Sequence, residues 1–171
     1  LNMFTPTQKS VAFSMFIGLA VSLLMLFVGS HINLHLETID RVKLLGRVLI
    51  VPVFFLMVCI GRMATHRFFT PADINGDPNR SDTPTAIELQ RVLQNTLEQS
   101  VLATIVYVIW TIVAPDQSLA TLVIAAGLFA LGRILFIAFH SRGATGRAMG
   151  FVLTFYPTCM LFFDAALKSL E

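Results

Sequence analysis

The chain has 171 residues, of which 56% are hydrophobic and only 13% are charged. Soluble domains carry about 25% charged residues, and the apolar residues here are grouped in long blocks. The net charge of +2 is small, and no basic run is interleaved with aromatic residues. These features exclude a water-soluble globular domain and give no indication of a nucleic-acid partner.

Five apolar segments follow one another along the chain, each about 20 residues or longer. This length crosses a hydrocarbon core of roughly 30 Å at about 1.5 Å per helical residue. Because open sheet edges cannot face lipid and strand-like alternation is absent, we predict an all-α integral membrane protein with five spans. The segments cover approximately Val11–Ile32, Val42–Met63, Gln90–Val113, Ser118–His140 and Ala148–Leu167.

The first segment resembles a secretory signal, since Lys9 precedes an apolar run. Its length exceeds the apolar core of about 7–15 residues that such signals carry. We therefore expect a retained transmembrane helix. The predicted organisation is an additional N-terminal span over residues 1–36, followed by a four-helix transmembrane domain over residues 37–171.

The connections between the segments differ in length. The short connection Ala114–Gln117 predicts a tight antiparallel pair of the third and fourth helices. The long connection from Ala64 to Leu89 is polar and contains the turn signal Asn75-Gly76-Asp77-Pro78. We expect Thr85 to cap the third helix, with Glu88 three residues later completing a capping box.

The distribution of Lys and Arg predicts an orientation in the membrane. Most of these residues gather on the side that carries the N-terminus, so this side is expected to be cytoplasmic and the C-terminus to lie opposite. Which membrane the protein occupies stays open. The expected cytoplasmic group is Lys9, Arg62, Arg67, Arg80, Arg91, Arg142 and Arg147, and the opposite group is Arg41, Lys43 and Lys168.

Polar residues within the third segment share one helical stripe. Arg91, Asn95 and Glu98 are spaced i, i+4 and i+7. A charge inside the hydrocarbon marks a functional site by default. Polar side chains also hold membrane helices together by hydrogen bonds. The spacing alone leaves a ligand site and interhelical attachment as open alternatives.

The fourth and fifth segments carry further charges. Arg133 and His140 are seven residues apart on one stripe, and Arg133 lies at a depth similar to that of Glu98. Arg133 and Glu98 can therefore form a structural ion pair. Arg147 opens the fifth segment and Arg62 ends the second. Each of these two is either a site residue or an ordinary cytoplasmic-side charge.

All these groups are expected to converge in the cytoplasmic third of the bundle. Arginine binds carboxylates in a bidentate manner, and Glu98 suits an ammonium group. The pattern predicts a pocket for a small anionic, peptide-like ligand. The spacing of Cys59 and Cys159 matches no metal site, and we expect both to be apolar core residues without a disulfide.

At these residues the chain resembles the MAPEG family, the membrane-associated proteins of eicosanoid and glutathione metabolism. The resemblance covers roughly Val42–Leu167. The run Arg91-Val92-Leu93-Gln94-Asn95-Thr96-Leu97-Glu98 is similar to the family's Arg-x-x-x-Asn-x-x-Glu signature. Further parts of the family pattern resemble Arg62 with Phe69-Thr70-Pro71-Ala72-Asp73, Gly132-Arg133 with Phe136, and Arg147 with Pro157.

The resemblance implies a four-helix bundle that assembles as a homotrimer and binds glutathione as co-substrate between subunits, without a metal. The implied activity is that of a glutathione-dependent transferase or peroxidase acting on lipophilic electrophiles or hydroperoxides from the bilayer. Arg147 is implied as the catalytic residue that stabilises the glutathione thiolate. The implied glutathione contacts are Arg62, Arg91, Asn95, Glu98, Arg133 and His140.

Several positions depart from the family pattern. His140 stands where the family often has Tyr, and Gln99 stands where leukotriene C synthases have Tyr. Ala148 and Phe151 replace the Ser and Tyr of the prostaglandin E synthase branch. These departures argue against both eicosanoid specificities. They leave open a non-catalytic lipid-binding or scaffold protein, and an accessory subunit of a membrane complex or a small transporter.

Overall fold

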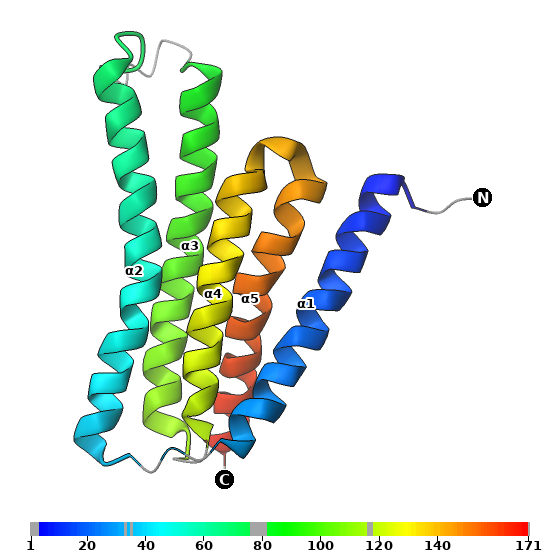
Figure 1. Cartoon of the computed structure of the whole chain (residues 1–171), viewed down its shortest axis with the longest axis vertical. Helices are drawn as coiled ribbons and strands as arrows, with labels where there is room; N and C mark the ends of the chain where they lie inside the picture. Colours follow the sequence, from blue (N-terminus) through cyan, green and yellow to red (C-terminus); the bar gives the residue numbers. More distant parts are fainter. Residues whose placement is uncertain (1–3, 33, 35, 76–81, 116–117, 171) are drawn as a thin grey trace.

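The computed structural model describes residues 4–32, 34, 36–75, 82–115 and 118–170. This part of the chain is helical and contains no strand. Five α-helices are drawn in Figure 1, with one short 3₁₀ helix between the last two. The elements are α1 (Pro6–His31), α2 (Thr38–Phe69), α3 (Pro84–Val113), α4 (Ala120–Phe139), η2 (His140–Arg142) and α5 (Gly143–Lys168).

Within the described residues, four segments are long and apolar enough to cross a membrane. Three of them are α1, α2 and α3, and the fourth, Ala120–Lys168, contains both α4 and α5. These last two helices pack side by side after a reversal at η2 (Figure 1). Gly143 allows this reversal because it adopts a φ of 77°, which other residues rarely take. The predicted all-α membrane class is confirmed.

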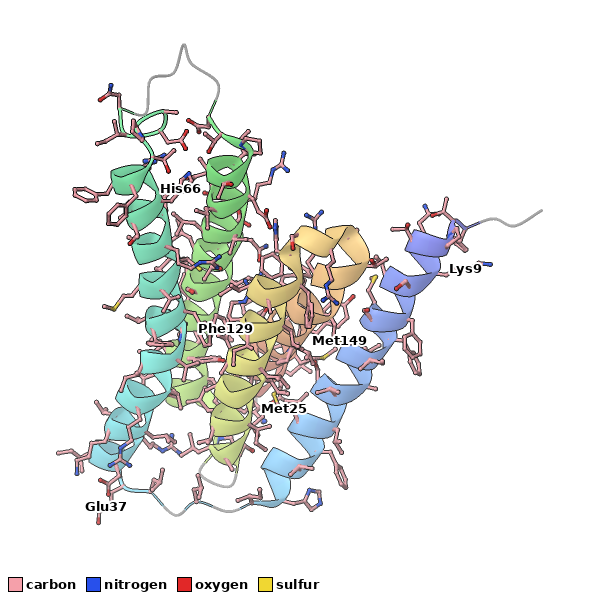
Figure 2. All side chains as sticks on the ribbon, turned by 45° about the horizontal axis from the view of Figure 1, so that its top comes forward. Lys9, Met25, Glu37, His66, Phe129 and Met149 are labelled. Atoms are coloured by element: carbon pink, nitrogen blue, oxygen red, sulfur yellow. The ribbon has the colours of Figure 1, made fainter. Side chains whose placement is uncertain are left out.

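The helices alternate in direction, so that their ends gather in two groups. The N-terminal end of α1, the C-terminal end of α2, the N-terminal end of α3 and the α4–α5 turn lie at one end (Figure 1). Figure 2 shows Lys9 and His66 toward this end and Glu37 at the opposite one. α5 ends at Lys168, at the end of the bundle opposite to the start of α1 (Figure 1).

The boundaries of α2 and α3 differ from the sequence prediction. Both helices are longer than expected, and the predicted cap at Thr85 is wrong. Thr83 is the N-cap of α3, and its side chain accepts a hydrogen bond from the backbone N–H of Ala86. The reason is Pro84, which fits the first helical position because no N–H is needed there. The predicted turn at residues 76–78 and the predicted connection at 116–117 lie outside the described residues.

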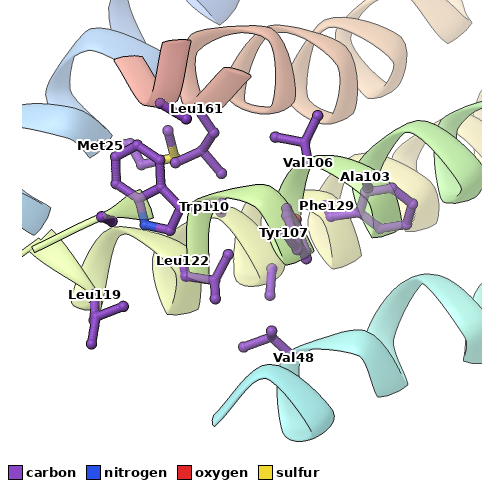
Figure 3. Packing of buried hydrophobic residues seen from close by; sticks show 14 of the residues in the cluster. Met25, Val48, Ala103, Val106, Tyr107, Trp110, Leu119, Leu122, Phe129 and Leu161 are labelled. Carbon is purple, nitrogen blue, oxygen red and sulfur yellow. The ribbon is translucent and has the colours of Figure 1, made fainter. Parts of the chain in front are cut away.

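A close-packed core occupies the half of the bundle nearer the C-terminus (Figure 3). Tyr107 and Trp110 of α3, Leu122 and Phe129 of α4 and Leu161 of α5 are almost completely buried. Large apolar side chains also cover the outer surface of the helices. In a bilayer these outer side chains face lipid, which explains their exposure. The core therefore holds the helices together beneath the more polar end.

α4 and α5 are in close contact at Gly150, in the polar half of the bundle. A Cβ atom added to Gly150 would lie 2.3 Å from the backbone nitrogen of Phe136 and 2.7 Å from the backbone oxygen of Gly132. Glycine lets the two backbones touch at this point. This contact fixes the height of Arg133 on α4 relative to Arg147 on α5. Cys59 is buried and Cys159 is half-buried, and both are free.

Candidate functional site

A pocket of about 580 Å³ opens among α1, α3, α4 and α5, in the half of the bundle that carries the α4–α5 turn. Its polar wall is formed by Arg91, Asn95, His140 and Arg147. The remaining wall is aliphatic and aromatic, with Phe136 and Phe151 among its residues. A volume of this size lies within the range of about 300–1,000 Å³ that is usual for small-molecule sites.

Helical spacing explains why these side chains meet. Arg91 and Asn95 are one turn apart on α3, so they share a face. The reversal at Gly143 returns the chain beside α4, which places Arg147 one turn into α5 and next to His140 at the end of α4. Four of the seven residues predicted for the site therefore line one pocket.

The two arginines of the pocket carry charges that no carboxylate neutralises in the described part of the chain. Arg91 and Arg147 are both exposed to the open space, and neither makes an ion pair or a side-chain hydrogen bond with a described residue. Two free guanidinium groups on one partly apolar cavity attract an anion. The cavity therefore has the charge expected of a site for an anionic ligand.

Arg133 lies behind the pocket wall and is completely buried, with 0% of its surface exposed. Its guanidinium donates one hydrogen bond to Oδ1 of Asn95 at 2.9 Å and another to Oγ1 of Thr154 at 2.8 Å. It also lies 4.5 Å from the centre of the Phe136 ring. Because Arg133 occupies the oxygen of the Asn95 amide, the NH₂ group of Asn95 is left to donate.

The expected ion pair between Arg133 and Glu98 is not present. Glu98 is exposed and accepts a hydrogen bond of 2.9 Å from Nε2 of Gln94 on its own helix. Glu98 lies on the exposed side of α3, whereas Asn95 lies on the side of α3 that faces Arg133 of α4. Asn95, rather than Glu98, meets the buried arginine.

His140 is held between two neighbours at the edge of the pocket. Its Nδ1 lies 3.4 Å from Oε1 of Glu88 on α3, and its ring packs edge-on against Phe136 with 5.3 Å between centroids. From the sequence we predicted only a capping role for Glu88, and its contact with His140 was missed. Residues 52 positions apart give no local signal for such a contact.

Arg62 and Glu98 lie outside the pocket in the single chain. Arg62 is exposed near the C-terminal end of α2, and Glu98 is exposed on α3. The pocket wall includes neither of them. The structure of one chain therefore brings Arg91, Asn95, His140 and Arg147 together, places Arg133 behind them, and leaves Arg62 and Glu98 on the outer surface.

A second polar cluster joins the ends of α2 and α3 and was not predicted. Asp73 is only 2% exposed and accepts hydrogen bonds from the side chain of Thr83 at 2.6 Å and from its backbone N–H at 3.0 Å. Nε2 of His66 lies 2.8 Å from the same carboxylate. The two hydrogen bonds from Thr83 hold the pKa of Asp73 below its ordinary value. This cluster fastens the α2–α3 connection.

The fold and the pocket define a helical membrane protein with a cationic cavity near one end of its bundle. Residues 44–167 match the model of the MAPEG family, and the chain belongs to this family. Its membership indicates a membrane function related to glutathione or eicosanoid metabolism. MAPEG proteins are typically trimeric and use lipophilic substrates. No curated protein and no solved structure matches the chain.

α1 lies before the residues that match the family, although it supplies part of the pocket wall through Val11 and Met15. In the described part of the chain, no group of three or more His, Cys, Asp or Glu residues is arranged to hold a metal ion.

Proposed function

We propose that the chain is a glutathione-dependent membrane transferase or peroxidase that acts on lipophilic electrophiles or hydroperoxides. The observation that carries this proposal is the shared pocket of Arg91 and Arg147, whose charges are not neutralised by any described residue. Glutathione is a tripeptide with two carboxylates, one ammonium group and one thiol. It therefore matches a cavity with two cations and amide donors at one side.

Each polar wall residue has a role in this proposal. Arg91 binds a carboxylate of glutathione, and the NH₂ group of Asn95, oriented by Arg133, donates a hydrogen bond to the peptide. His140 closes the edge of the site. Arg147 lies beside the sulfur, because a nearby cation favours the thiolate over a thiol whose ordinary pKa is about 8.5. Lowering that pKa by two units requires about 2.7 kcal/mol.

The thiolate then reacts in one of two ways. In transfer, its sulfur forms a bond with an electrophilic carbon, and the leaving group departs with its electron pair. In peroxide reduction, the sulfur attacks one oxygen of a hydroperoxide, the O–O bond breaks, and the alkoxide takes a proton to become an alcohol. A second glutathione condenses with the resulting sulfenic acid, which yields the disulfide and water. The pocket's apolar wall favours lipophilic partners in both cases.

The proposed topology has five spans, with α4 and α5 each crossing once. In the proposed division of the chain, α1 lies within an additional N-terminal transmembrane segment, residues 1–36, and α2 to α5 lie within a four-helix domain, residues 37–171. The Lys9 end, and with it the pocket, faces the cytoplasm by the distribution of Lys and Arg. We propose a homotrimer in which Arg62 and Glu98, both exposed in the single chain, complete the glutathione site at the subunit interface.

The test compares two arginine variants by ultraviolet absorbance of the bound thiolate. Arg147→Ala should abolish the thiolate signal that glutathione produces with the unaltered protein, without dissociating the assembly. Arg142→Ala is the matched control, because Arg142 is also exposed near the α4–α5 turn but packs on Phe139 outside the pocket. An unchanged signal in Arg147→Ala removes this residue from the proposed role.

A second candidate is a non-catalytic lipid-binding or scaffold protein, as the mostly apolar wall around Phe136 and Phe151 would allow. Titration calorimetry separates the two candidates. The enzyme must bind glutathione at concentrations up to millimolar, whereas the scaffold need not. Absence of glutathione binding, together with binding of a lipid to the same pocket, would favour the scaffold.

A further inference from the structure

α1 is firmly packed against the rest of the bundle, although it lies before the family region. A Cβ atom at Gly18 would lie 2.7 Å from Cβ of Val152 on α5, and one at Gly29 would lie 2.0 Å from Oγ1 of Thr121 on α4. Real Cβ atoms do not approach other atoms this closely, so the two glycines allow the helices to touch. α1 therefore packs closely against α5 and α4.

The N-terminal half of α1 leans away from α5, as Figure 1 shows. The pocket occupies the space that this divergence leaves. Val11 and Met15 line it from α1, while Arg91 and Arg147 line it from α3 and α5. The position proposed for the glutathione sulfur and the surface of α1 therefore belong to one cavity.

A second cavity extends this space toward the start of α1. It has a volume of about 480 Å³ and reaches Phe4, the first described residue. It shares Val11, Met15 and Ala144 with the pocket, so the two cavities are neighbours. Together they form an elongated and largely apolar space between the first half of α1 and the beginning of α5.

The two faces of α1 differ in what they meet. Phe13 and Phe16 are exposed on the outer surface, at 65% and 70%, where they would contact lipid. Met15 and Val11 line the two cavities, and Met15 is less exposed than these phenylalanines, at 46%. Methionine is unbranched and adapts to chains of different shape. α1 thus forms one side of the elongated space.

From these observations we infer that α1 forms the binding wall for the lipophilic co-substrate, and that this co-substrate is an electrophile with a long alkyl chain. The chain lies along Met15 and Val11, and its reactive carbon lies at the Arg147 end. This inference rests on the proposed function for the thiolate itself. Met15 is then a specificity-determining residue that the family region, residues 44–167, does not contain.

The test uses a series of 2-alkenals of increasing chain length with saturating glutathione. Thiolate addition forms an S–C bond at the β-carbon, the π electrons of the C=C bond move to the α-carbon, and that carbon takes a proton from water. In the unaltered protein, kcat/KM referred to the alkenal concentration free in water should rise about four-fold for each methylene group that becomes buried, until the space is full.

Met15→Trp fills the space and, at saturating glutathione, should flatten this dependence on chain length. Phe16→Trp is the matched control, since it adds a similar side chain on the outer face of the same helix and should leave the dependence intact. Met15→Ala widens the space and should extend the increase of kcat/KM to longer alkenals. This variant also tests the proposal if Met15→Trp fails to fold.

Each outcome decides between the claims. With thiolate present, an unchanged chain-length dependence in both Met15 variants, or an equal effect of Phe16→Trp, overturns the role of α1. If the unaltered protein forms no thiolate, the proposed function fails. A photoreactive alkyl diazirine then tests separately whether α1 binds an alkyl chain. Labelling of the peptide with Val11 and Met15 that a long-chain alkenal competes away supports the wall, and labelling without competition overturns it.

Discussion

Replacement of Arg133 by lysine tests whether this buried arginine acts from behind the pocket. The guanidinium of Arg133 bonds Asn95 and Thr154 simultaneously, from one planar group. Lysine keeps the positive charge but presents it as a single point on a flexible stem. We therefore expect Arg133→Lys to keep at most one of the two hydrogen bonds. The released Asn95 amide would also lose its fixed orientation toward the pocket.

The loss of stability follows from the number of hydrogen bonds that Arg133 makes in the structure. A hydrogen bond from a charged donor contributes about 1.5–3 kcal/mol, and a buried acceptor left unsatisfied adds to the loss. Arg133→Lys should therefore lower the free energy of unfolding by about 1.5–3 kcal/mol. Arg142→Lys, at an exposed position near the same end, should change it by less than about 0.5 kcal/mol.

Two measurements on the purified protein in detergent check this prediction. Unfolding in a denaturing-detergent titration gives the change in stability, and calorimetry gives the affinity for glutathione. Both should fall in Arg133→Lys and stay near the unaltered values in Arg142→Lys. The reasoning is refuted if Arg133→Lys unfolds like the unaltered protein and binds glutathione equally well, because Arg133 would then neither support the wall nor orient Asn95.

Other predictions concern packing and pH. Gly150→Ala places a Cβ 2.3 Å from the backbone of Phe136 and should lower the unfolding free energy by about 1–3 kcal/mol, whereas Gly127→Ala, with open space around it, should not lower it. Thr83→Ala removes the α3 cap and should cost about 0.5–2 kcal/mol, measured by the same unfolding titration. Asp73 has a lowered pKa, so its stabilising effect is complete above its ordinary value of 3.8 and is lost as pH falls through the lowered value. Protection of the backbone amides near Asp73 from hydrogen exchange, corrected for the intrinsic pH dependence of exchange, should fall over that acid range and stay constant at neutral pH. A flat profile, or equal destabilisation in both glycine variants, would contradict these accounts.

Membrane thickness explains why much of the fold could be predicted from the sequence. Each span must bury about 20 apolar residues, so the apolar blocks mark the helices directly. Helical periodicity likewise placed Arg91 and Asn95 on one face of α3, and both line the pocket. Both inferences need only the spacing of residues within one helix, and this spacing can be read from the sequence.

The rest of the site depends on how helices rotate against each other. The sequence positions place Arg133 and Glu98 at similar depths along their helices, which suggested an ion pair. The rotation of α3 and α4 about their own axes instead directs Arg133 to Asn95 and Thr154. The packing of α1 depends on two of its glycines, which contact Val152 and Thr121, and these contact residues are distant from α1 in the sequence. No local pattern gives either relation, so the buried position of Arg133 and the wall formed by Met15 emerged only from the structure.

The most direct test of the whole account is a cryo-electron microscopy map of the protein with glutathione bound in a lipid nanodisc. We predict tripeptide density in the pocket, with the sulfur beside the guanidinium of Arg147 and a carboxylate at Arg91. Density for the tripeptide at another place, or in the pocket with its sulfur away from Arg147, would contradict it.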